Sequence, residues 1–109
     1  MKSINSHSVS GYIGKEITTS QGRSASVTRF TLIHSMGKDR EPLYIDMTLF
    51  SGTYGPDVDM NLLQEKTPVV VDFRMAPNTY EKDGRKTTRI QNIVTGIRPA
   101  EDDQQNLEA

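Results

Sequence analysis

Apolar and polar residues alternate along several short runs of this chain, and this period of two constrains its fold more than any other feature. In LYIDMTLFSG, residues 43–52, the side chains of Ile45, Met47 and Leu49 fall on one side of an extended backbone. In VVVDFRM, residues 69–75, one set is apolar throughout and the other ends in Asp and Arg. Successive side chains of a strand point to opposite faces, so both runs predict strands with one face in a core.

Three further runs, at residues 9–13, 25–34 and 89–97, are rich in β-branched or aromatic residues and also predict strands. Gln21-Gly22 predicts a turn between the first two strands, and Asp83-Gly84 predicts a tight turn between the last two. The chain is therefore expected to contain five strands.

Two irregular features are predicted as well. The alternation slips near Arg29-Phe30, which indicates a bulge or a strong bend in the second strand. Between the third and fourth strands, Asp57 is expected to cap a short helix over residues 58–66. Five strands, one short helix and no internal repeat favour an all-β, five-stranded Greek-key barrel, since a sandwich would usually have about seven strands.

The length of 109 residues fits one domain, expected over residues 1–99, followed by an acidic and disordered tail over 100–109. All 13 Lys and Arg residues lie at or before Arg98, with ten of the 14 acids. The body therefore carries a net charge of +3 and the tail −4. Charge alone fits either a polyanion-binding domain with an acidic extension or an ordinary solvated surface.

Several kinds of chemistry have no motif in this sequence. There is no cysteine, and His7 and His34 lie far apart with no carboxylate at ligand spacing, so neither a metal nor a cofactor is expected. Phosphate-cradling glycine patterns and a nucleophile elbow are also absent, so we expect no enzyme. No run approaches the ~20 apolar residues that span a bilayer. We therefore expect no membrane contact and a cytoplasmic location.

The polar face of the run at 43–52 carries an aromatic ring near each end. Tyr44 and Phe50 are six residues apart, and Asp46 and Thr48 between them indicate that this face is wet. Unpaired bases stack on such rings, and every base has a π face, so the contact tolerates any nucleotide sequence. The alternative is that both rings cover the end of the barrel or bury against a second subunit.

The connection between the last two strands is rich in cations and holds Tyr80. Cations interleaved with an aromatic ring suit an arm that grips phosphates while the ring stacks on a base. A solubilising hairpin tip would carry the same charges without needing the ring. Lys38 and Arg40, in the loop at 35–42, extend the predicted electrostatic track. The cations of the hairpin are Arg74, Lys82, Arg85, Lys86 and Arg89.

The order of these motifs resembles that of the bacterial and phage single-stranded DNA-binding proteins, which have an OB fold. The resemblance rests on SVSGYIGKEI, VTRFTLIHS, LYIDMTLFSG and the long run TPVVVDFRMAPNTYEKDGRKTTRIQNIVTGIRP, and it covers about residues 4–99. It implies an OB-fold barrel with Tyr44, Phe50 and Tyr80 at base-stacking positions. Lys38 stands close to the place of a further family Trp, where a phosphate contact is expected instead.

The resemblance also implies a function and partners. It predicts a non-catalytic protein that binds single-stranded DNA in replication, recombination or repair, forms a homodimer or homotetramer, and contacts replication or repair proteins. The alternative is an accessory or adapter protein, similar to the primosomal replication protein, whose aromatic face mainly docks a protein. Strong binding of single-stranded DNA would favour the first prediction over the second.

Overall fold

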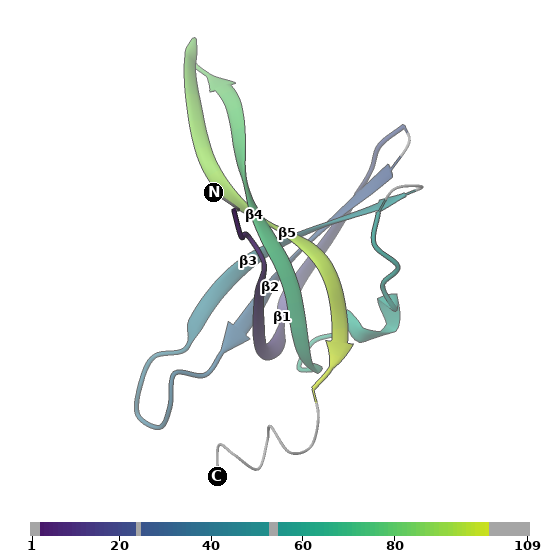
Figure 1. The fold of residues 1–109 in the computed structure, drawn as a ribbon, viewed down its shortest axis with the longest axis vertical. Helices are drawn as coiled ribbons and strands as arrows, with labels where there is room; N and C mark the ends of the chain where they lie inside the picture. Colours follow the sequence, from purple (N-terminus) through teal and green to yellow (C-terminus); the bar gives the residue numbers. More distant parts are fainter. Residues whose placement is uncertain (1–2, 24, 53–54, 101–109) are drawn as a thin grey trace.

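The five strands of this protein close into one barrel, as seen in a computed structural model that describes residues 3–23, 25–52 and 55–100 (Figure 1). The order around the barrel is β1-β2-β3-β5-β4. Neighbouring strands are antiparallel except for a short parallel pairing of β3 with β5. The all-β, five-stranded barrel predicted from the sequence is confirmed. The strands are β1 (His7–Gln21), β2 (Ala25–His34), β3 (Leu43–Gly52), β4 (Pro68–Lys82) and β5 (Arg85–Pro99).

Side chains from the inner faces of all five strands form a single core. The predicted alternation of β3 is confirmed, because Met47 and Leu49 are almost completely buried and Ile45 packs against the same cluster. Burying one such side chain contributes about 1.5–3 kcal/mol relative to leaving it in water. The buried members of the core are Ile13, Phe30, Leu32, Met47, Leu49, Leu63, Val69, Val71, Phe73 and Val94.

β1 is much longer than the predicted strand at 9–13, because it pairs with a different neighbour along each half. Its first half lies beside β4 and its second half beside β2. The register with β2 shifts between Ile13, which pairs with Leu32, and Ile17, which pairs with Phe30. This irregularity lets one strand bend around the barrel and serve both neighbours.

The predicted bulge in β2 at Arg29-Phe30 is wrong, since β2 keeps a continuous register with β3 through this point. The irregularity lies on the neighbouring strand instead, where the extra residues of β1 stand opposite the stretch from Phe30 to Leu32. The alternation of β2 is intact but includes a polar residue, Thr28, on the buried face. Its hydroxyl lies 3.1 Å from the hydroxyl of Thr19 on β1, which satisfies the hydrogen-bonding need of both groups. Thr28, a polar residue at a core-facing position, therefore obscured the alternation of apolar and polar residues in the sequence of this strand.

The predicted helix at 58–66 is also wrong beyond a single turn. The structure has only a 3-10 helix, η1 (Met60–Leu62). Its cap is Asp59 and not Asp57: the Asp59 side chain accepts a hydrogen bond of 3.0 Å from the backbone N–H of Asn61. A helix this short gains too few backbone hydrogen bonds to be stable alone, and only the packing of this loop against the barrel retains it.

β4 and β5 continue beyond the barrel as a two-stranded ribbon, called here the arm (residues 76–91), which projects well away from the other strands (Figure 1). The ladder runs without a break from Ala76↔Gln91 to Lys82↔Arg85. The predicted turn at Asp83-Gly84 is confirmed, with φ angles of 55° and 78° that match a mirror-image hairpin turn.

The strand predictions at 69–75 and 89–97 are too short because residues of the arm have no core to face. Pairing of β1 with β4 ends at His7↔Phe73. Met75 comes next on the face predicted to be buried, yet it is 41% exposed. Just before the start of β1, the Asn5 side chain accepts a hydrogen bond from the Met75 N–H at 3.0 Å and donates one to the Met75 carbonyl at 2.7 Å. Asn5 thus continues the pairing of this edge for one residue.

The described residues end at Ala100, so the rest of the predicted tail at 100–109 lies outside them. Over the described part of the chain, no helix has both the length and the apolar character that crossing a membrane requires.

Candidate nucleic-acid interface

The outer face of β3 carries the two aromatic residues singled out in the sequence. Tyr44 is 65% exposed, whereas Phe50 is half-buried. Asp46 is exposed as predicted, but Thr48 is only 8% exposed and the prediction of a wet Thr48 is wrong. The reason is its place in the sheet: Thr48 pairs with Arg29 of β2 on one side and with β5 on the other.

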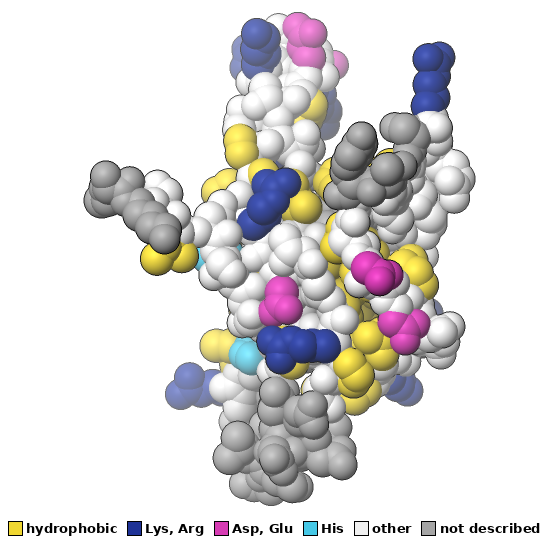
Figure 2. All heavy atoms as spheres, turned by 45° about the vertical axis from the view of Figure 1, so that its right-hand side comes forward, with side chains coloured by type: hydrophobic (Ala, Val, Ile, Leu, Met, Phe, Trp, Pro, Cys, Tyr) yellow, Lys and Arg dark blue, Asp and Glu magenta, His cyan; other side chains and the backbone are white. Residues whose placement is uncertain are grey.

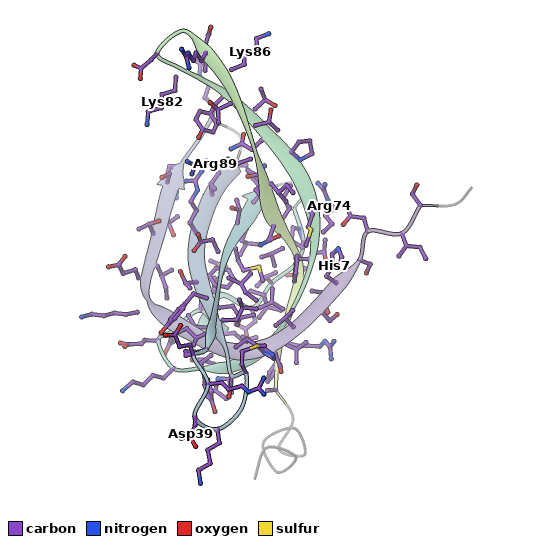
Figure 3. All side chains as sticks on the ribbon, turned by 90° about the vertical axis from the view of Figure 1, so that its left-hand side faces the viewer. His7, Asp39, Arg74, Lys82, Lys86 and Arg89 are labelled. Carbon is purple, nitrogen blue, oxygen red and sulfur yellow. The ribbon has the colours of Figure 1, made fainter. Side chains whose placement is uncertain are left out.

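A groove of about 390 Å³ lies between the outer face of β1, β2 and β3 and the base of the arm. Figure 3 shows Arg89 on the part of the arm that overhangs these strands. The floor of the groove comes from three neighbouring strands and its wall from the arm, so residues far apart in sequence meet here. The groove is lined by Glu16, Thr18, Arg29, Phe30, Thr31, Asp46, Met47, Thr48, Asn78, Arg89, Ile90 and Gln91.

Two cations and two carboxylates line the groove: Arg29 and Arg89, Glu16 and Asp46. Among the described residues, the only ion pair within 4.0 Å joins Arg98 to an aspartate elsewhere, so none of these four groups is held in an ion pair there. Reasoning from the sequence missed Arg29 as a site residue. Its outward position on a strand next to β3 was the signal that could have found it. No three His, Asp or Glu side chains of the described part gather as a metal site.

A second hollow, the Phe50 pocket, has a volume of about 480 Å³ and is lined by Phe50, Gly55, Pro56, Arg74, Ile93, Val94 and Thr95. It adjoins the groove, because Phe50 follows Thr48 by one outward position on β3 and Ile93 follows Gln91 on β5. The structure therefore brings Arg74, an exposed cation, to the same pocket as the Phe50 ring. An apolar floor with a cation at its edge suits a flat ring attached to an anion.

The cations of the arm are divided between its two faces. Cross-strand partners share a face, and the pairs Lys82↔Arg85, Tyr80↔Thr87 and Asn78↔Arg89 alternate with Glu81↔Lys86. The guanidinium carbon of Arg89 lies 5.9 Å from the centroid of the Tyr80 ring, which is a cation–π contact. Tyr80, Lys82, Arg85 and Arg89 are thus brought together on the face that continues the groove.

Lys86 lies on the opposite face of the arm, across from Glu81. Figure 3 shows Lys82 and Lys86 on different sides of the arm, and Figure 2 shows basic and acidic side chains side by side at its end. The structure therefore separates Lys86 from the other arm cations, with which the sequence had grouped it.

Lys38 and Arg40 are also separate from the arm. Their loop lies at the other end of the barrel, where Figure 3 labels Asp39. The loop turns sharply, with Gly37 and Asp39 at φ angles of 116° and 63° and a hydrogen bond of 3.3 Å from the Arg40 N–H to the Gly37 carbonyl. The predicted electrostatic track therefore consists of two clusters of cations, one at each end of the outer face of β3.

A polar cluster on another part of the outer surface joins β1, β4 and β5. The Ser8 hydroxyl donates to Asp72, and the Arg98 guanidinium lies 3.3 Å from the same carboxylate. These two contacts, the hydroxyl first, lower the pKa of Asp72 below its ordinary value of 3.8 against the opposing effect of partial burial. The cluster ties three strands together and lies outside the groove.

Comparison with known proteins finds likeness in structure only. No protein-family model matches the chain, and no curated protein matches it in sequence. Rim1, a mitochondrial single-stranded DNA-binding protein of S. cerevisiae, aligns with a TM-score of 0.62 and 20% identity over 90% of this chain and 96% of that one.

Two other solved structures are similar over almost their whole length. A Plasmodium falciparum SSB in complex with single-stranded DNA aligns with a TM-score of 0.62 and 15% identity, over 93% of this chain and 98% of that one. A small single-stranded DNA-binding protein of Streptomyces coelicolor aligns with a TM-score of 0.52 and 15% identity, over 92% and 96%. At these identities the likeness establishes the fold: the barrel is the OB fold that these proteins share.

Proposed function

We propose that this protein binds single-stranded DNA without catalysing a reaction, and that it serves DNA replication, recombination or repair. The observation that carries the proposal is the open groove along β3, with Tyr44 beyond one end, the Phe50 pocket at the other, and a cationic arm beside it. The solved structures support the proposal, because each is a single-stranded DNA-binding protein and one holds single-stranded DNA.

The three rings supply the part of the affinity that does not depend on charge. Tyr44 presents most of its ring to solvent, Phe50 forms the wall of an open pocket, and Tyr80 stands on the arm. Each base that stacks on an aromatic side chain contributes about 1–3 kcal/mol. Because every base has a π face, these contacts accept any nucleotide, and a duplex with its bases already stacked cannot use them.

Cations at both ends of the face supply the phosphate contacts. A strand that enters past Lys38 and Arg40, passes Tyr44 and follows β3 towards the Phe50 pocket would meet Arg74 at the pocket, and the other cations of the second cluster stand on the arm. Each Lys or Arg that neutralises a phosphate releases a counterion, so affinity should fall with salt at about 0.7 logarithmic units per contact. The second cluster consists of Arg74, Lys82, Arg85 and Arg89.

Tyrosine emission provides a direct test, because the chain has no tryptophan. Adding a long oligothymidine should quench the emission, and the quench should weaken as the salt concentration rises. A duplex of the same length, at the same salt, is the control and should bind much more weakly. Equal affinity for the duplex and the single strand would contradict the proposal.

A second candidate function is docking of a protein, favoured by exposed apolar side chains at the Tyr44 end of the face. Tyr12 is 44% exposed and Tyr44 65% exposed. Tyr12 and Tyr44 both pair with Ile33, so they form one row across β1, β2 and β3. Exposed apolar patches of this kind are typical of protein interfaces. A second copy of the chain is the partner we propose, giving a dimer or tetramer.

Light scattering of the purified protein tests this second proposal. The wild type should have the mass of a dimer or tetramer, and Tyr12→Ser should shift it towards the monomer. A monomeric wild type would contradict the oligomer. A filter-binding titration with single-stranded DNA separates the two functions, because a protein that only docks partners should bind DNA weakly.

A further inference from the structure

A carboxylate stands in the middle of the proposed DNA-binding groove. Asp46 is exposed on the outer face of β3, one outward position from Tyr44 and one from Thr48. Its only side-chain hydrogen bond in the described part of the chain comes from the Thr31 hydroxyl, at 3.3 Å. No Lys or Arg nitrogen of the described residues lies within 4.0 Å of it. The charge of Asp46 is therefore open to whatever occupies the groove.

An open carboxylate selects the part of a nucleic acid that can lie against it. It repels phosphates, so the sugar-phosphate backbone should keep to the cations of the arm and of the loop at 35–42. A carboxylate is also only an acceptor, with two oxygens that need N–H or O–H donors. The groups that can satisfy it are the donor-bearing edges of bases, which must therefore point towards β3.

The four bases differ in the donors they offer. Cytosine, adenine and guanine each carry an exocyclic amino group, and aspartate accepting from the cytosine amino group is a known mode of base recognition. Thymine has a single ring N–H between two carbonyl oxygens, and those oxygens meet a carboxylate unfavourably. We infer that Asp46 makes this protein prefer strands with amino-bearing bases over thymine, an inference that rests on the proposed binding of single-stranded DNA.

Arg29 strengthens the same preference from the neighbouring strand. It is exposed in the groove and pairs with Thr48, whereas Asp46 pairs with Thr31, so the two side chains are diagonal neighbours on one face. Diagonal positions lie about 7–8 Å apart, within reach of one base. Arg29 is only a donor and Asp46 only an acceptor. Cytosine presents an amino donor beside carbonyl and ring-nitrogen acceptors on the same edge, and so satisfies both.

Oligocytidine and oligothymidine of equal length are the most direct pair of probes, because both consist of pyrimidines with one ring to stack. Fluorescence anisotropy at a fixed salt concentration should give the wild type roughly fivefold or more higher affinity for the cytidine strand, the lower limit for one specific base contact. Asp46→Asn should bring this ratio close to one, because an amide offers thymine both a donor and an acceptor.

Asp39→Asn is the matched control. It removes the same charge from an exposed position outside the groove, and asparagine adopts the left-handed backbone of residue 39, at φ 63°, as readily as aspartate. The control should retain the wild-type ratio. A ratio that falls equally in both variants would overturn the inference, since charge at any position would then explain it.

The outcomes separate this inference from the function on which it rests. Equal affinity of the wild type for the two strands overturns the base preference and leaves single-stranded DNA binding intact. Failure to bind either strand overturns the proposed function itself. A cytidine preference that disappears only in Asp46→Asn supports both.

Discussion

The two halves of β4 differ sharply although they belong to one continuous strand. In the barrel half, Val69 and Val71 are fully buried and Phe73 is 5% exposed, whereas the other half, which runs from Arg74 into the arm and ends at Lys82, contains no buried residue. The change falls where β1 stops pairing with β4. A strand has a buried face only where its neighbours close a barrel around it. One half of β4 therefore contributes side chains to the core, and the other half is exposed to solvent.

This difference suggests which part of the proposed interface positions the bases and which part contacts the phosphates. Phe50 stands on β3, which pairs with β2 along its length and with β5 at Met47 and Thr48, and whose inner face packs in the core. Tyr80 and most of the second cation cluster stand on a two-stranded ribbon. An isolated two-stranded ribbon is marginally stable at best in water. The barrel should therefore set the position of the bases, and the arm should adapt to the phosphates.

The largest effect is expected from a change in the barrel core. Leu49→Ala removes a fully buried side chain and should lower the free energy of unfolding by about 2–5 kcal/mol, measured by urea denaturation. Lys86→Ala, at an exposed position of the arm, is the control and should change it by about 0.5 kcal/mol or less. Equal losses in the two variants would contradict the division between barrel and arm.

The next effect concerns the ring on the arm. Tyr80→Ala should weaken binding of single-stranded DNA by about 1–3 kcal/mol. The melting temperature should stay nearly unchanged, because Tyr80 belongs neither to the core cluster nor to the hydrophobic side chains packed against it. Fluorescence anisotropy and a thermal melt measure the two quantities. Tyr80→Phe keeps the ring and should retain most of the affinity; if it binds as weakly as Tyr80→Ala, stacking is not what Tyr80 contributes.

The two faces of the arm should differ in their dependence on salt. Lys82→Ala combined with Arg85→Ala removes two cations from the Tyr80 face and should reduce the slope of log affinity against log salt by about 1.4, at about 0.7 per contact. Lys86→Ala removes a cation from the opposite face and should leave the slope unchanged. Equal changes per cation on both faces would mean that the arm contacts phosphates without regard to face.

The smallest effect is expected at the Asp72 cluster, outside the interface. Because the pKa of Asp72 is lowered in the folded protein, its carboxylate stabilises the fold above pH 3.8, and this contribution is lost as the pH falls through the folded pKa. The group is partly exposed, so the contribution should stay below about 1 kcal/mol. Unfolding measured from pH 6 to pH 3 should show a shallower loss in Asp72→Asn, with unchanged DNA affinity at neutral pH. An identical pH dependence in both proteins would contradict this role.

The barrel could be predicted from the sequence because its pattern is local. Alternating apolar residues in β3 face the core as expected, and the tight turn at Asp83-Gly84 depends on two residues alone. The predictions were wrong where the structure depends on which other residues a side chain or strand contacts. Thr28 is buried because Thr19 satisfies its hydroxyl, and the arm forms strands because its two halves pair with each other and not with a core.

The candidate site was predictable only in part for the same reason. The rings of Tyr44 and Phe50 follow from the period of one strand, and the face of Tyr80 follows from the hairpin register. The groove requires three strands and the arm to come together, which no local pattern encodes. Arg29 was therefore missed, and Lys38 and Arg40 were grouped with an arm that lies at the other end of the barrel.

Backbone amide shifts recorded during titration with a short single-stranded oligonucleotide test the central claim most directly. The account predicts that the largest changes fall on the outer face of β3 from Tyr44 to Phe50, on Arg29, and on the Tyr80 face of the arm. Ser8, Asp72 and Arg98 serve as the reference surface and should hardly move. Changes centred on that reference surface, or none at all, would contradict the account.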